Sequence, residues 1–112
     1  MTPGFSSAPL GVFGGTFDPI HFGHLRTAFE ILQTVRLQAV RFVPAGDPPH
    51  RDPPQVDAAR RLDFVRAAVA DQPGFDVDDR EIRRGGRAYS VLTLAELRVE
   101  LPGTPLCVIV GM

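Results

Sequence analysis

His21 and His24 stand three residues apart, where an apolar run and two glycines give way to a helical pattern. Residues three apart share one face of a helix, so each neutral imidazole can donate one N–H bond into the same small volume. The unpaired N–H groups and positive dipole end of a helix N-terminus attract phosphate oxygens, and Gly23 leaves room for phosphate to approach the backbone. These residues predict a phosphate-handling site.

The elements that must position the histidines alternate between strand and helix patterns. Leu10–Phe13 is a short apolar run typical of a buried strand, and we expect Gly14 and Gly15 to turn the chain sharply after it. A helix is expected from about Phe22. Its apolar stripe would consist of Leu25, Ala28, Phe29 and Leu32.

The rest of the chain continues this alternation. Further strands are expected at 39–43, 75–77 and 106–110, and further helices at 57–70, with Leu62, Val65 and Val69 on one side, and at 90–100, where Ser90 can act as N-cap. Such alternation predicts an α/β fold, a Rossmann-like parallel sheet with flanking helices and right-handed crossovers. The glycine turn, the proline-rich loop 44–54 and Gly111 should meet at the carboxyl edge of the sheet, where ligands bind.

Bulk properties restrict the class of protein. The 112 residues allow one small domain, which we place at 10–112 after a flexible tail at 1–9. A hydrophobic content of 44% suffices for a packed core, and a net charge of −1 argues against a general nucleic-acid or membrane partner. Cys107 has no partner for an intrachain disulfide and is expected to be a small buried hydrophobe. Neither a signal peptide nor a membrane span is recognisable, so we expect a cytoplasmic protein.

Three segments carry a family resemblance. Residues 14–24, GGTFDPIHFGH, resemble the HxGH signature of the nucleotidylyltransferase superfamily. Residues 42–51, FVPAGDPPHR, and 78–90, DDREIRRGGRAYS, resemble one branch of it, the bacterial nicotinate-nucleotide adenylyltransferases. The resemblance covers nearly all of 10–112. It implies adenylyl transfer from ATP to nicotinate mononucleotide, giving nicotinate adenine dinucleotide and pyrophosphate in NAD biosynthesis, with Mg²⁺ bridging phosphate oxygens.

The resemblance also assigns ATP-binding residues. It implies that His21 and His24 contact the ATP phosphates, with His24 the better candidate for stabilising the transition state. A nucleotide loop that offers backbone N–H groups would consist of Gly14, Gly15, Thr16 and Phe17. We expect Asp18 to shape this loop by bonding to backbone two residues on.

The nicotinate nucleotide is expected to meet two other segments. His50 and Arg51 border it in the resemblance, with Arg51 where the family carries lysine, which changes a point donor to a planar fork. Tyr89 can border the pyridine ring, and Ser90 can present its hydroxyl and helix N-terminal amides to the carboxylate. Arg83, Arg84 and Arg87 read as a solvated face.

Other interpretations stay open. The glycines suit a plain strand-to-helix turn, His50 an ordinary surface loop, and Ser90 a simple cap. A metal site at the histidines is disfavoured, because Asp18 alone would not complete a zinc shell, and no protein ligand for a metal is assigned. The enzyme alternative is another HxGH nucleotidylyltransferase, such as a pantetheine-phosphate adenylyltransferase or a cytidylyltransferase. A class I aminoacyl-tRNA synthetase fragment is disfavoured by the length and by the absence of a basic tRNA-binding surface.

The resemblance bears on the end of the chain as well. The family's last-strand motif continues beyond Gly111-Met112 with an aspartate, so we expect a chain truncated at its C-terminus. An uncovered last strand is an aggregation hazard, and the 112 residues alone are therefore expected to be poorly soluble or inactive. A non-catalytic nucleotide-binding fragment is the alternative from outside the enzyme class.

Overall fold

The computed structural model describes residues 8–46, 56–85 and 90–110. Its elements follow in the order β1 (Leu10–Gly15), α1 (Phe22–Thr34), β2 (Ala39–Pro44), α2 (Ala58–Val69), β3 (Phe75–Val77), α3 (Arg80–Arg84), α4 (Ser90–Glu100) and β4 (Leu106–Ile109). Each element expected from the sequence is present, with ends that differ by at most two residues. The five-residue helix α3 was not predicted, because so short a segment shows no periodicity.

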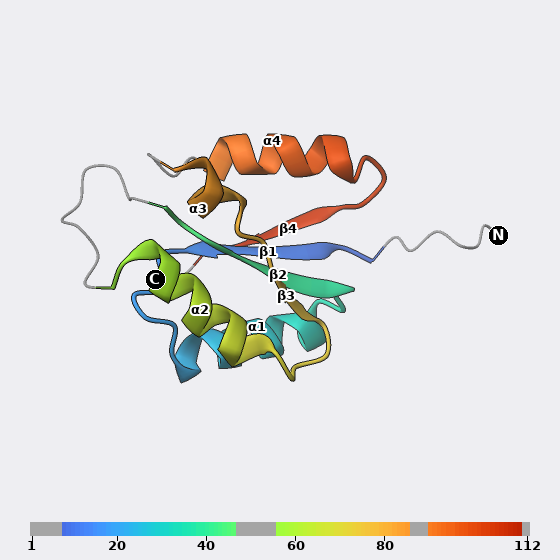
Figure 1. Ribbon diagram of the computed structural model, residues 1–112. Coiled ribbons are helices and arrows are strands. Elements are labelled where there is room, and N and C mark those ends of the chain that lie inside the picture. The colour runs from blue at the N-terminus through green and yellow to red at the C-terminus, as the bar shows by residue number, and fades with distance from the viewer. Residues whose placement is uncertain (1–7, 47–55, 86–89, 111–112) are drawn as a thin grey trace.

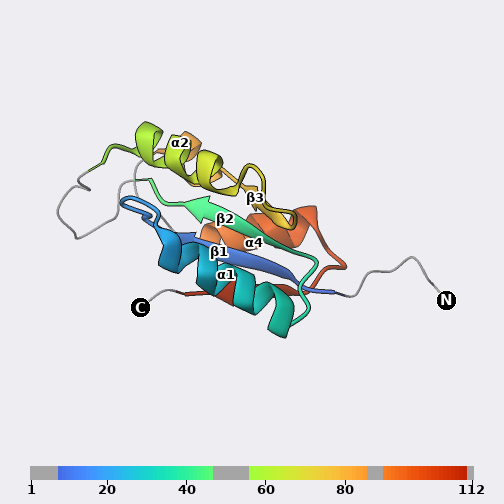
Figure 2. The same cartoon turned by 90° about the horizontal axis from the view of Figure 1, so that it is seen from below.

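The four strands form one parallel sheet in the order β3-β2-β1-β4. Helices α1 and α2 cover one face of this sheet, and α3 and α4 cover the other (Figures 1 and 2). The predicted Rossmann-like α/β fold is thus confirmed. Adjacent β1 and β2 end at the same edge, where Gly15 pairs with Pro44 and the Ala45 N–H donates to the Gly15 carbonyl over 2.8 Å.

The main core lies between the sheet and helices α1 and α2. It consists of Phe13, Phe17, Ala28, Leu37, Val40, Phe42, Val65, Val69 and Ile109. On α1, Ala28 is fully buried and Leu25 and Leu32 pack against this core, as predicted. The prediction for Phe29 is wrong, because its side chain is 46% exposed and Ile31 packs against the core instead.

A smaller apolar cluster lies on the opposite face, under α4. Val12 of β1, Val43 of β2 and Leu97 of α4 form it, with Leu94 and Leu106 packed alongside. Its small size follows from α4, whose Val91 and Val99 are 81% and 80% exposed.

The start of the sheet also tests several expectations. Strand β1 runs through both glycines to Gly15, so the prediction that Gly14 and Gly15 form the sharp turn is wrong. The left-handed conformation falls instead on Phe17, with φ of 50°. Cys107 is partly exposed but packs against the main core. Ala8 and Pro9 accept bonds from Gln38, while residues 1–7 of the expected tail lie outside the described residues.

Among the described residues, no helix has the length and apolar character needed to cross a membrane.

Candidate active site

The two histidines cap the N-terminus of α1 reciprocally. His21 is the N-cap residue, and its Nδ1 accepts the Gly23 N–H over 3.1 Å. The Nδ1 of His24 accepts the His21 N–H over 3.0 Å. The two rings therefore lie against each other, with centroids 3.8 Å apart. The structure brings both predicted histidines into one cluster.

The cap determines where each imidazole carries its proton. A ring nitrogen that accepts an N–H bond has no hydrogen of its own, so each neutral ring is protonated at Nε2. Partial burial and the neighbouring His21 imidazole lower the pKa of His24, which keeps it neutral near pH 7. Two adjacent Nε2–H donors are thus available at this helix end.

The cap also corrects the expected source of phosphate donors. The N–H groups of His21 and Gly23 donate to imidazoles, and those of His24 and Leu25 donate to the His21 carbonyl. The prediction of unpaired amides here is wrong for these groups, because the short polar rings fold back onto the helix end. The N–H donors available to a phosphate at this helix end are therefore the imidazole Nε2–H groups.

Gly23 serves the cap and not the ligand. A Cβ built on Gly23 would lie 2.9 Å from Cε1 of His21 and 3.1 Å from its Nδ1. The space that we expected phosphate to use beside this backbone is taken by the His21 ring. Only glycine allows that ring to lie so close to the first turn.

Phe17 anchors the loop between β1 and α1. Its side chain is 3% exposed, and its ring meets that of His24 edge-on at 5.0 Å. A Cβ on Gly15 would lie 3.4 Å from the Phe17 ring, so Gly15 lies tight against that ring. The structure thus gives Phe17 a packing role beside His24, in addition to the backbone N–H role implied by the resemblance.

Gly14 behaves differently from Gly15. It lies exposed at the carboxyl end of β1, and a Cβ built there meets nothing within 4 Å. No described side chain demands glycine at this position. The open space is where a bound molecule could approach the backbone closely.

The loop after β1 is bonded to the start of α2. Asp18 accepts the N–H of Val56 over 2.8 Å, a long-range bond in place of the expected local one. Arg61, which sequence analysis did not single out, is fully buried and donates to the Thr16 carbonyl over 2.7 Å. A signal was present, since Arg61 precedes Val65 and Val69 at intervals of four on the buried helix face.

The expected nicotinate-nucleotide residues are mostly beyond the described segments. His50, Arg51 and Tyr89 lie outside them, and of Ser90 only the backbone is described, as the first residue of α4. The structure therefore neither joins them to the histidines nor separates them. Their roles stay predictions.

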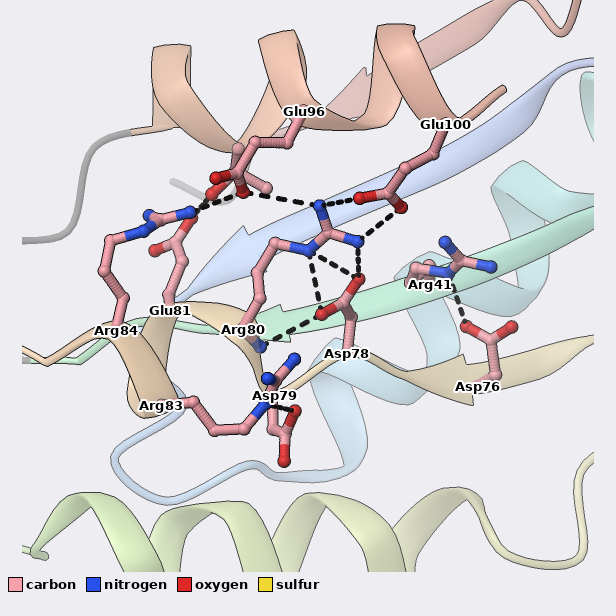
Figure 3. A network of polar contacts seen from close by, with 11 residues as sticks. Arg41, Asp76, Asp78, Asp79, Arg80, Glu81, Arg83, Arg84, Glu96 and Glu100 are labelled. Atoms are coloured by element: carbon pink, nitrogen blue, oxygen red, sulfur yellow. Dashed lines mark hydrogen bonds and ion pairs between the residues drawn. The ribbon is translucent and has the colours of Figure 1, made fainter. Parts of the chain in front are cut away.

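The arginines near α3 do not form a plain solvated face (Figure 3). Arg83 is exposed, as expected, and it pairs with Asp79. Arg84 is 23% exposed and reaches Glu96 at 2.6 Å. Arg80, 14% exposed, bridges Asp78 at 2.9 Å and Glu100 at 2.8 Å. The prediction for Arg84 is wrong, because α3 turns this residue toward α4. Arg87 lies outside the described residues.

Among residues 8–46, 56–85 and 90–110, no group of three or more His, Cys, Asp or Glu side chains gathers in a way that could hold a metal ion.

Comparison with known proteins places this site in a family. Residues 12–111 match the family model described as cytidylyltransferase-like. A probable nicotinate-nucleotide adenylyltransferase of Halorhodospira halophila is 54% identical over 102 residues, 91% of this chain and 47% of that protein. One of Aeromonas salmonicida is 49% identical over 105 residues, 94% of this chain and 49% of that protein. The chain spans about half the length of the curated relatives it matches.

A solved structure supports the fold. The nicotinic acid mononucleotide adenylyltransferase of Plasmodium falciparum, complexed with NaAD, superposes with a TM-score of 0.74 at 14% identity. The match covers 90% of this chain and 50% of that chain. The resemblance to nicotinate-nucleotide adenylyltransferases, first seen in three sequence segments, is confirmed by these findings.

Proposed function

The chain belongs to the cytidylyltransferase-like family, and from this premise we propose that its protein transfers the adenylyl group of ATP to nicotinate mononucleotide, releasing pyrophosphate. The observation that carries the proposal is the reciprocal cap of His21 and His24, which leaves two Nε2–H donors side by side. The names of the curated relatives support the choice of nicotinate mononucleotide as acceptor.

The histidines would act by charge stabilisation. Transfer of a phosphoryl-type group requires alignment of nucleophile and leaving group and donors for the charge that develops on the oxygens. His24 supplies one such donor as a neutral Nε2–H, with its ring held by the His21 N–H and by the edge of Phe17. His21 supplies the second, at the exposed end of the cap. The preformed cap spares the site a reorganisation during the reaction.

The ATP phosphates would approach along the end of β1. Gly14 leaves open space there, and Gly15, Thr16 and Phe17 continue the backbone toward the histidines. Their N–H groups would bind phosphate oxygens, as the resemblance implies.

The second substrate would bind beside this loop. We assign the nicotinate nucleotide to His50, Arg51, Tyr89 and Ser90 on the resemblance alone. The support from described residues is positional: β2 leads into the segment with His50, and α4 begins at Ser90. Amides at the start of an eleven-residue helix favour the carboxylate of nicotinate over the neutral amide of nicotinamide.

Magnesium would enter with ATP. Mg²⁺ prefers oxygen ligands and commonly binds through substrate phosphates, whereas the described site presents imidazole N–H donors. These residues do not fit a protein-held Mg²⁺ site.

Pyrophosphate release tests the proposal. The full-length gene product should turn over with ATP, Mg²⁺ and nicotinate mononucleotide, and His24→Ala should lose at least about 100-fold in kcat, since one transition-state donor is commonly worth that much. Thr27→Ala, an exposed position on the same helix, is the matched control and should keep wild-type activity. Activity with phosphopantetheine but not nicotinate mononucleotide would leave only the family assignment standing. Nucleotide binding without pyrophosphate release would select the non-catalytic alternative.

Gly14 provides a second, independent variant. Gly14→Ala meets no described atom, so its thermal unfolding should match that of the wild type while KM for ATP rises. If Gly14→Ala keeps the wild-type KM, ATP does not approach this backbone.

A further inference from the structure

We propose that Arg61 is a positioning residue for the adenylyl transfer: its buried guanidinium ties together the chain after β1, the chain after β2 and the entry to α2, and so holds His24 in place through Phe17. The inference rests on the proposed function, because it assigns His24 to that reaction. It concerns a residue whose described hydrogen bonds go to backbone carbonyls.

The guanidinium of Arg61 gathers four backbone carbonyls from three segments. Nη1 donates to Thr16 over 2.7 Å and to Ala45 over 2.8 Å, and Nη2 donates to Gly46 over 3.1 Å. Nε donates to Val56 over 2.9 Å. The side chain is fully buried, so water does not reach its N–H donors.

Two of these segments, the chain after β1 and the entry to α2, are joined by a further bond. Asp18, two residues after Thr16, accepts the Val56 N–H over 2.8 Å. Both polar groups of the Val56 peptide are therefore bound, the N–H by Asp18 and the C=O by Arg61. The loop after β1 is fixed to α2 at two points.

Burial of a guanidinium is costly, and apolar residues occupy the rest of this helix face at Leu62, Val65 and Val69. Replacement of buried charged groups by apolar ones is often neutral or stabilising, so the gain from Arg61 is better explained by specificity of geometry. Only arginine presents five N–H donors in a rigid fork that can reach separate carbonyls at once. A lysine at position 61 would keep the positive charge but would lack that fork.

The consequence reaches His24 through one residue. Thr16, whose carbonyl Arg61 holds, is followed by Phe17, which adopts a left-handed φ of 50°. The Phe17 ring then meets the His24 ring at 5.0 Å with an interplanar angle of 81°. If Thr16 moves, this turn and the ring contact move with it.

The test uses the full-length gene product with Arg61→Lys, which keeps the charge and loses the fork. Arg60→Lys is the matched control, because Arg60 is the exposed preceding residue of α2. Both are compared at a temperature where circular dichroism shows the wild-type folded signal. For Arg61→Lys we expect a 10- to 100-fold lower kcat, because a displacement of a catalytic group by about 1 Å lowers the rate by that order. KM for ATP should stay unchanged.

A second readout does not depend on turnover. In ¹³C-histidine-labelled protein without substrate, the Cε1–H signal of His24 senses the ring current of Phe17, and it is assigned by its loss in His24→Ala. Arg61→Lys should displace this signal, and Arg60→Lys should leave it in place. A wild-type kcat together with a wild-type His24 signal in Arg61→Lys, with only a lower Tm, would overturn the proposal.

Two further outcomes remain decisive. If Arg61→Lys does not fold, Asp18→Ala removes the bond to Val56 and should displace the His24 signal from its wild-type position; an unmoved signal contradicts the proposal. If the wild-type protein shows no turnover with nicotinate mononucleotide, the proposed function fails, and the His24 signal still decides whether Arg61 holds that ring.

Discussion

The two faces of the sheet are stabilised by different kinds of interaction. Between the sheet and helices α1 and α2 lies an apolar core that, in the described part of the chain, has nine buried residues, among them Phe42 at 0% exposure. Among its described side chains, helix α4 on the other face adds Leu97 as its fully buried apolar contact, and ion pairs to α3 supplement it (Figure 3). Apolar burial is insensitive to pH, whereas paired carboxylates titrate. The two faces should therefore respond differently to substitution, acid and salt.

The comparison also bears on where the chemistry sits. The histidines and the hydrogen bonds of Arg61 lie on the face covered by α1 and α2, which has the larger apolar core. A donor that must stay fixed while charge develops benefits from a rigid, closely packed support. Helix α4, which begins at Ser90 in the proposed nicotinate segment, has the weaker attachment.

The largest effect is expected from Phe42→Ala. Phe42 is fully buried in the main core, and its ring contacts those of Phe13, Phe17 and Phe75. Removal of the ring should lower the free energy of unfolding by about 4 kcal/mol, from lost burial and the cavity left behind. Urea unfolding at pH 7 measures it. A loss below about 2 kcal/mol would mean that this core repacks easily.

Leu97→Ala is the matched truncation on the α4 face. Leu97 is fully buried but has fewer apolar neighbours, so we expect a loss of about 3 kcal/mol. Hydrogen exchange should show new opening in α4 while α1 keeps its protection. Equal loss of protection in both helices would show that the two faces unfold as one unit.

Arg80→Leu should cost about 2 kcal/mol, since it leaves the partly buried Asp78 carboxylate without its cation. Burial alone would raise the pKa of Asp78, but its bonds from Arg80 lower the pKa below the usual value. With a folded pKa below the unfolded one, wild-type stability is present near neutrality and declines from about pH 5 downward. Arg80→Leu should flatten that decline, as measured by urea unfolding between pH 3 and 7. Arg83→Leu, at an exposed pair, is the control and should keep the wild-type slope.

Thr93→Val probes the hydroxyl–carboxylate hydrogen bond of the α3–α4 contact. The buried Thr93 hydroxyl donates to Glu81 Oε2 over 2.6 Å. Loss of this bond to a charged group should cost about 1.5 kcal/mol in thermal or urea unfolding. Thr93→Ser keeps the hydroxyl and should recover most of the loss; a serine variant as weak as valine would assign the effect to packing.

The smallest effect is expected on the solvent side of α1. Arg26 pairs with Glu30 at 3.3 Å, and both side chains are more than half exposed. Arg26→Gln should change the free energy of unfolding by less than about 0.5 kcal/mol and should lose even that in 1 M salt. A change above 1 kcal/mol would mean that this exposed ion pair contributes to the free energy of unfolding as we expect only of the ion pairs between α3 and α4.

The elements were predictable where the pattern is periodic and local. The strand at Phe75–Val77 and the helix of Leu62, Val65 and Val69 follow from apolar spacing alone. Phe29 shows the limit of such spacing, because helical periodicity alone does not distinguish whether Phe29 or Ile31 lies on the buried face. In the structure, Ile31 is the residue that packs against the core.

The candidate site was predictable in its residues and not in its bonds. The sequence placed His21 and His24 at a helix start, but the expected free amides and the space beside Gly23 are used by the rings themselves. Such folding back depends on rotamers that residue types do not specify. Arg84 was likewise expected to be a surface charge, whereas in the structure α3 places it against Glu96.

By itself, the sequence determined the alternation of strands and helices, the family and the two histidines, because these depend on local periodicity and on a contiguous motif. Only the tertiary structure decided which nitrogen of each histidine carries the proton and what Arg61 binds. The proton positions depend on which ring nitrogens accept the hydrogen bonds of the helix cap. The bonds of Arg61 depend on segments up to 45 residues apart in the chain, as between Arg61 and Thr16. A buried donor must find its acceptors wherever the fold places them, and residue spacing alone does not reveal that place.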